Sequence, residues 1–110
     1  MNKKQKAIYE EMVAKIVEQN EEAVIFPDYA EALIGYVTIF NKVHATYDRQ
    51  TCLEILMKRD GMTWEEAEDF FSFNTEGSFL GEFTPAILNR HEPMEVSKPS
   101  KPKKIKSKKK

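Results

Sequence analysis

The fold is decided by one stretch in the middle of the chain, Ala32-Leu33-Ile34-Gly35-Tyr36-Val37-Thr38-Ile39-Phe40-Asn41-Lys42-Val43-His44-Ala45-Thr46-Tyr47. Its β-branched and aromatic residues are typical of strands, and Asn41-Lys42 has the position of a two-residue turn between two of them. The stretch therefore predicts a β-hairpin. Because apolar residues fall on both faces of its first strand, we expect that strand to be central or covered on both sides.

Upstream of the hairpin, apolar residues recur at helical spacing and predict an amphipathic N-terminal helix. They are Ile8, Tyr9, Met12, Val13, Ile16 and Val17. A short apolar run at residues 23–26 stops at Pro27 and predicts one more strand. We expect the N-terminal helix to pack on the sheet, because an isolated helix of this length is marginally stable in water.

Downstream of the hairpin, two helices are predicted in succession. Asp48 is a candidate N-cap for a helix over residues 49–59, which Gly61 is expected to end. Thr63 and Glu66 form a capping box for a second helix over residues 64–73, expected to bury Ala67, Phe70 and Phe71. A short strand at 86–88 closes the predicted α+β fold, in which a short antiparallel β-sheet packs against an N-terminal helix and a central helix pair.

The net charge of −1 conceals two oppositely charged parts of the chain. Residues 1–96 contain nine basic and eighteen acidic residues, whereas residues 97–110 contain eight lysines and no acid. The lysine-rich end has too few apolar residues to offset its ordering entropy. We therefore expect a single compact acidic domain over residues 1–90 and a disordered, basic tail over residues 91–110.

The tail lysines are the candidate nucleic-acid-binding residues, because clustered lysines attract polyanions. They are Lys98, Lys101, Lys103, Lys104, Lys106, Lys108, Lys109 and Lys110. The alternative is a solubilising tail that stays close to its own acidic domain. The 110 residues contain no apolar run of the ~20 residues that a membrane span needs, and the single cysteine excludes an intrachain disulfide.

Part of the chain resembles a known family. The resemblance rests on the stretch Met57–Glu68, on Phe73-Asn74-Thr75 with Gly77, and on Gly81-Glu82-Phe83-Thr84-Pro85. These residues resemble a family of small, functionally uncharacterised proteins of bacteriophages and prophage loci, and the likeness covers roughly residues 23–88. It implies a soluble protein of the bacterial host cytoplasm. It implies no activity, cofactor or catalytic residue, and it leaves out the lysine tail.

The residues that usually carry catalysis or bind metals form no recognisable motif in this sequence. On a strand, His44 and Asp48 lie about 13 Å apart, which is too far to share one metal ion. Cys52 falls on the apolar side of a helix, where a buried and inert thiol is expected. Gly77 and Gly81 lack the Gly-Lys-Ser/Thr ending of a phosphate-binding loop. We therefore predict a protein that is not an enzyme and has no cofactor or metal.

The candidate partner-binding residues lie in and before the irregular segment 74–85. Phe79, Leu80 and Phe83 belong to that segment, and the alternative is that its glycines allow close packing of Phe79 and Phe83. Trp64 is either an interface anchor or a residue at the edge of the core. The sequence favours a small phage accessory protein that binds a macromolecular partner, with the tail contacting nucleic acid non-specifically. The alternatives are an inhibitor or adaptor of a host protein acting through the acidic domain, and an enzyme with an unrecognised site.

Overall fold

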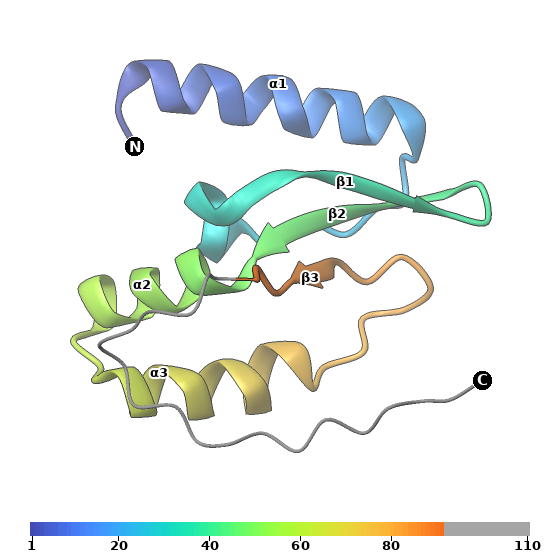
Figure 1. Cartoon of the computed structure of the whole chain (residues 1–110). Coiled ribbons are helices and arrows are strands. Elements are labelled where there is room, and N and C mark those ends of the chain that lie inside the picture. Colours follow the sequence, from blue (N-terminus) through green and yellow to red (C-terminus); the bar gives the residue numbers. More distant parts are fainter. Residues whose placement is uncertain (92–110) are drawn as a thin grey trace.

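The computed structural model describes residues 1–91 and has the predicted α+β fold (Figure 1). In the view of Figure 1 the sheet lies between α1 and α3. Apart from His91, the predicted disordered tail and its eight lysines lie outside the described residues. The elements in chain order are α1 (Lys3–Gln19), η1 (Pro27–Ala32), β1 (Leu33–Ile39), β2 (Lys42–Asp48), α2 (Arg49–Asp60), α3 (Trp64–Phe71), η2 (Ser72–Glu76) and β3 (Ala86–Leu88).

The three strands form one mixed sheet in the order β1-β2-β3. β1 and β2 are antiparallel, with Leu33 opposite Tyr47 and Ile39 opposite Lys42, which confirms the predicted hairpin. β3 pairs in parallel with the end of β2. The sheet is therefore not wholly antiparallel, because the helices α2 and α3 carry the chain back across the molecule before β3 begins.

The hairpin turn lies one residue earlier than Asn41-Lys42. Phe40 and Asn41 occupy it, and both have positive φ angles of 52° and 65°. A two-residue turn with positive φ at both positions matches the twist of the two strands that it joins. Asn accepts this conformation readily, and Lys42 becomes the first residue of β2.

β1 is an edge strand, so the expectation of a central or doubly covered strand is wrong. β2 is its only partner among residues 1–91, because β3 pairs with the other side of β2. Ile34, Tyr36 and Ile39 are consequently 48%, 38% and 55% exposed. The strand Leu33–Ile39 contains no charged residue.

The strand predicted at residues 23–26 is absent, because this run makes isolated hydrogen bonds instead of a ladder. The Val24 amide donates to the Phe83 carbonyl at 3.3 Å, and the Phe26 amide donates to the Tyr47 hydroxyl at 2.8 Å. Pro27 then begins the 3-10 helix η1. The run thus packs against the core and bonds to a loop and to a side chain.

The predicted helix ends are largely confirmed. The Asp48 side chain caps α2, Gly61 ends it in the left-handed conformation, and Thr63 and Glu66 form the capping box of α3. α3 ends at Phe71, however, and the chain continues as the π-helical turn η2. The prediction that Phe70 is buried is wrong, since its side chain is 39% exposed.

The core is one cluster in which aromatic rings join the sheet to the helices. The Tyr47 ring lies 5.1 Å from that of Phe26, and the Tyr29 ring meets the fully buried Phe71 edge-on at 5.6 Å. Burial raises the pKa of Tyr47 to about 12, which keeps its hydroxyl neutral as a hydrogen-bond partner of Phe26. These contacts fix α3 and η2 against the sheet.

Candidate binding surface

One arginine holds the junction between α3 and η2 in place. The Arg49 Nε donates to Glu76 Oε2 at 2.8 Å, and its Nη atoms lie 3.3 Å from Glu68 Oε2 and from Ser72 Oγ. The guanidinium also lies 5.6 Å from the Phe71 ring centroid. Because Arg49 contacts residues before and inside the π turn, it fixes the position at which the chain leaves α3.

The loop after α3 is held by close backbone contacts. The Gly77 amide donates to the Ser72 carbonyl at 2.9 Å, and a Cβ at Gly77 would lie 3.0 Å from that oxygen. Further on, the Thr84 carbonyl lies 3.0 Å from His44 Nδ1, which ties the end of the loop to β2. The segment 72–84 is therefore irregular but anchored at both ends.

This anchored segment and η1 enclose a groove of about 300 Å³. Phe70 and Leu80 stand at its rim, and Asp28 is the only charged residue in its lining. An adjoining hollow of about 170 Å³ shares part of the same walls and has Phe79 in its lining. The residues that line the groove are Phe26, Pro27, Asp28, Tyr29, Phe70, Asn74, Thr75, Ser78 and Leu80.

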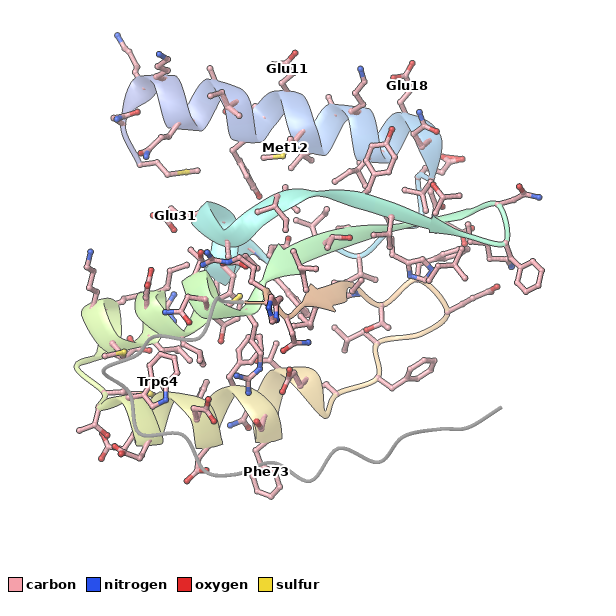
Figure 2. All side chains as sticks on the ribbon, in the orientation of Figure 1. Glu11, Met12, Glu18, Glu31, Trp64 and Phe73 are labelled. Carbon is pink, nitrogen blue, oxygen red and sulfur yellow. The ribbon has the colours of Figure 1, made fainter. Side chains whose placement is uncertain are left out.

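Four large apolar side chains are exposed on α3, on η2 and in the loop that follows, and we call them the aromatic surface: Phe70, Phe73, Phe79 and Leu80. Phe73 is 84% exposed, Phe79 is 77% exposed and Leu80 is 47% exposed. Figure 2 shows Phe73 pointing away from the body of the molecule. Exposed apolar side chains beside a concave region are typical of protein-protein interaction sites.

The structure brings together only some of the residues predicted to bind a partner. Phe79 and Leu80 belong to the aromatic surface. Phe83 is partly buried, with its ring 6.0 Å from that of His44, so it packs against β2 instead. Trp64, at the start of α3, is 39% exposed and lines a separate cavity with Arg49 and Arg90.

The predicted binding residues do not include Phe70 and Phe73, because Phe70 is expected to be buried and Phe73 ends the helix predicted over residues 64–73. A signal for their exposure is present in the sequence. Glu66 precedes Phe70 by four residues, and Asp69 precedes Phe73 by four residues, so each aromatic lies on the acidic side of the helix.

The residues considered for catalysis are occupied in structural contacts. His44 Nδ1 lies against the Thr84 carbonyl, and the Asp48 carboxylate accepts from the Thr51 amide at 3.0 Å and from its hydroxyl at 2.6 Å. Burial raises the pKa of the Cys52 thiol to about 12, so this thiol stays neutral at physiological pH. Within residues 1–91, no three His, Cys, Asp or Glu side chains are grouped as metal ligands.

The lysine tail begins at a fixed point beside α3. Arg90 Nε donates to Asp48 Oδ1 at 2.9 Å, and Arg90 Nη2 donates to Asp48 Oδ2 at 3.0 Å. Burial of the Asp48 carboxyl opposes its ionisation, but the hydrogen bonds from Arg90 and Thr51 outweigh burial and lower its pKa. Arg90 also lines the cavity that contains Trp64, so the chain leaves the domain next to the N-terminal end of α3.

Replacing Asp48 with alanine is expected to lower the free energy of unfolding by about 2–3 kcal/mol near neutral pH, because α2 loses its N-cap and Arg90 loses a charged partner. The pKa of Asp48 is lowered in the folded state, so this stabilisation is present above about pH 4 and is lost as the pH falls further. Urea unfolding at neutral and acidic pH measures both effects.

The matched control for this prediction is Asp60→Ala. Asp60 is a more exposed carboxylate, and its ion pair is with the neighbouring Arg59 at 3.1 Å. Its replacement is expected to change the free energy of unfolding by less than about 0.5 kcal/mol. Equal losses in the two variants, or a loss in Asp48→Ala that does not shrink in acid, would contradict the assigned role of Asp48.

Comparisons with protein-family models, with curated proteins and with solved structures returned no match to this chain. The phage family indicated by residues 23–88 therefore stays a prediction. None of the helices within residues 1–91 has both the length and the hydropathy that crossing a membrane requires.

Proposed function

We propose that this chain is a small, non-enzymatic binding protein with two parts. Its acidic domain binds a protein partner through the aromatic surface, and its lysine-rich C-terminal segment contacts nucleic acid. The observation that carries the first part is the exposure of Phe73 and Phe79, at 84% and 77%, on the same segment of the chain whose Phe70 and Leu80 line a groove of about 300 Å³. Buried aromatic anchors supply much of the binding energy at protein interfaces.

The geometry of the groove supports a partner that is both apolar and basic. The two hollows contain one acid each in their linings, Asp28 and Glu76, and no basic residue. Residues 1–91 as a whole contain nine basic and sixteen acidic residues. An acidic domain steers positively charged partners toward itself and disfavours acidic ones. Because Arg49 and Gly77 hold the loop, little ordering cost is expected on binding.

The nucleic-acid part of the proposal rests on the sequence of the tail. Residues 97–110 contain eight lysines and no acidic residue, whereas the acidic residues all lie earlier in the chain. Contact with phosphates by such a segment is non-specific and depends strongly on salt. Because residues 23–88 resemble phage proteins, we propose that this activity takes place in the bacterial cytoplasm during infection.

A second candidate function is an inhibitor or adaptor of a host protein that acts through the acidic domain alone. The same aromatic surface favours it, because that surface belongs wholly to the described domain. The two candidates differ in whether the tail is needed. If the inhibitor hypothesis is correct, partner capture persists after nuclease treatment and after neutralisation of the tail lysines.

The double variant Phe73→Ser/Phe79→Ser is expected to lose most of its capture of a protein partner from a nuclease-treated bacterial lysate, because both anchors of the aromatic surface are removed. The matched control is Phe40→Ser at the hairpin tip, where a 91% exposed phenylalanine lies outside the aromatic surface. Quantitative mass spectrometry of captured proteins gives the measurement. Equal capture by the double variant and the wild type would remove the aromatic surface from the proposal.

A further inference from the structure

The outer side of α3 and η2 combines acidic and aromatic side chains in one stripe. Glu66 precedes Asp69 by three residues and Phe70 by four, and Phe73 follows Asp69 by four residues and Phe70 by three, which places the four side chains on one face of the helix. Four of the eight residues of α3 are acidic and none is basic. In Figure 2 the labelled Phe73 projects from this side toward solvent.

Two of the α3 acids are available for an external cation. Arg49 binds Glu68, and the Glu66 side chain accepts from the Thr63 amide in the capping box. Glu65 and Asp69 are exposed and form no ion pair with another residue of the range 1–91. The face therefore offers negative charge beside exposed rings, and within the described domain no basic side chain neutralises these two acids.

The chain's own lysine segment begins close enough to reach this face. Arg90 is clamped to Asp48 and shares a cavity with Trp64, the first residue of α3. Lys98 follows His91 by seven residues, which span up to about 23 Å when extended. α3 is only about 12 Å long. A short connection of this kind gives the lysines a local concentration in the millimolar range at α3.

We propose that the segment Lys98–Lys110 docks in cis on the acidic and aromatic face of α3 and η2. Its eight lysines complement the unpaired carboxylates of Glu65 and Asp69. Ile105 is the only large apolar residue in the segment and lies among lysines, so it is the side chain that packs against Phe70 and Phe73. Lysine stems also pack well along exposed rings.

This docking couples the two binding activities, and the coupling rests on the proposed function. Nucleic acid and the α3 face compete for the same lysines, so nucleic acid that captures the segment uncovers Phe70 and Phe73. Protein partners then gain access to the aromatic surface. The cis contact itself requires neither a nucleic acid nor a protein partner, and it is tested without them.

The test places a spin label on the segment in the full-length chain. The substitution Ser107→Cys supplies a reactive thiol, while Cys52 stays unlabelled because it is fully buried and its pKa is raised to about 12. We expect the amide NMR signals of residues 65–73 to lose most of their intensity. Those of the acidic positions Glu10 and Glu11 on α1 are expected to keep theirs.

Two variants in the labelled protein separate docking on α3 from general attraction to an acidic domain. Glu65→Gln/Asp69→Asn is expected to restore the α3 signals, whereas the matched control Glu10→Gln/Glu11→Gln is expected to leave them broadened. In about 1 M salt, where the Debye length is ~3 Å, the broadening is expected to disappear. Equal broadening of α1 and α3, or no broadening of α3 at low salt, would overturn the proposal.

Addition of a short DNA duplex distinguishes a failure of docking from a failure of the proposed function. If the α3 signals are broadened and recover as duplex is added, docking and competition both hold. If they are broadened and unchanged by duplex, docking stands and nucleic-acid contact by the tail is wrong. If duplex binds but the α3 signals were never broadened, docking is wrong and nucleic-acid contact stands.

Discussion

Neutralising the tail lysines is expected to weaken binding to duplex DNA by about 100-fold or more at low salt, because the charges that displace counterions from the phosphates are removed. The variant replaces Lys98, Lys101, Lys103, Lys104, Lys106, Lys108, Lys109 and Lys110 with glutamine. For the wild type, the logarithm of affinity is expected to fall with the logarithm of salt concentration with a slope between about −4 and −7, for four to eight phosphates contacted.

Fluorescence anisotropy of a labelled duplex across a salt series measures this effect. The matched control replaces the same eight lysines with arginine, which keeps every charge and is expected to keep both the affinity and the salt slope. Equal binding by the glutamine variant and the wild type would show that the tail has no part in nucleic-acid contact. Binding of a protein partner through the aromatic surface would then be the only part of the proposed function that remains.

Phe71→Ala is expected to lower the free energy of unfolding by about 3–5 kcal/mol, because a buried phenylalanine leaves both a transfer cost and a cavity. Phe71 is fully buried, contacts the Tyr29 ring edge-on and lies under the Arg49 guanidinium. Its loss therefore also loosens the contacts that hold the aromatic surface. For a domain of this size, such a loss is a large part of the total stability.

Phe73→Ala is the control, because it removes an equal side chain two residues later in the chain. Phe73 is 84% exposed, so its replacement is expected to change the free energy of unfolding by less than about 0.5 kcal/mol. Urea unfolding followed by circular dichroism compares the two variants directly. Similar losses in both would mean that α3 is rotated relative to the arrangement described above.

Local signals in the sequence were sufficient for most of the fold. The caps at Asp48, Gly61 and Thr63 depend on contacts within four residues, and for this reason their positions were predicted correctly. The hairpin was also predictable, because its strands are adjacent in the chain. The turn was misplaced by one residue, since Phe40 adopts a positive φ that its residue type does not favour.

Features that depend on distant parts of the chain were not predictable in the same way. β1 has the composition of a buried strand, but its exposure was decided by β3, which joins the other side of β2. Residues 23–26 have the composition of a strand, yet their hydrogen-bond partners come from Tyr47 and Phe83. The spacing of apolar residues shows which side of an element is apolar, but it does not show which other element packs against that side.

The candidate surface was predictable in part. Phe79 and Leu80 lie in an irregular segment with glycines, a pattern compatible with either a packed loop or a loop that binds a partner. Phe83 and Trp64 are aromatic like Phe79, so the sequence alone does not distinguish them from it. In the fold, however, His44 packs against Phe83, and Trp64 lies at the opposite end of α3 from η2. Such contacts between β2, α3 and the loop arise only in the folded chain.

The uncharged edge of β1 has a consequence for how copies of the protein behave in concentrated solution. Strands at the border of a sheet usually bear lysine, proline or a similar obstacle to pairing with another molecule, and Leu33–Ile39 bears neither. Sixteen acidic and nine basic residues within residues 1–91 make the described domain negatively charged, and repulsion between two such domains opposes intermolecular strand addition. Added salt screens this repulsion and is therefore expected to favour contact between copies, independently of how firmly each copy is folded.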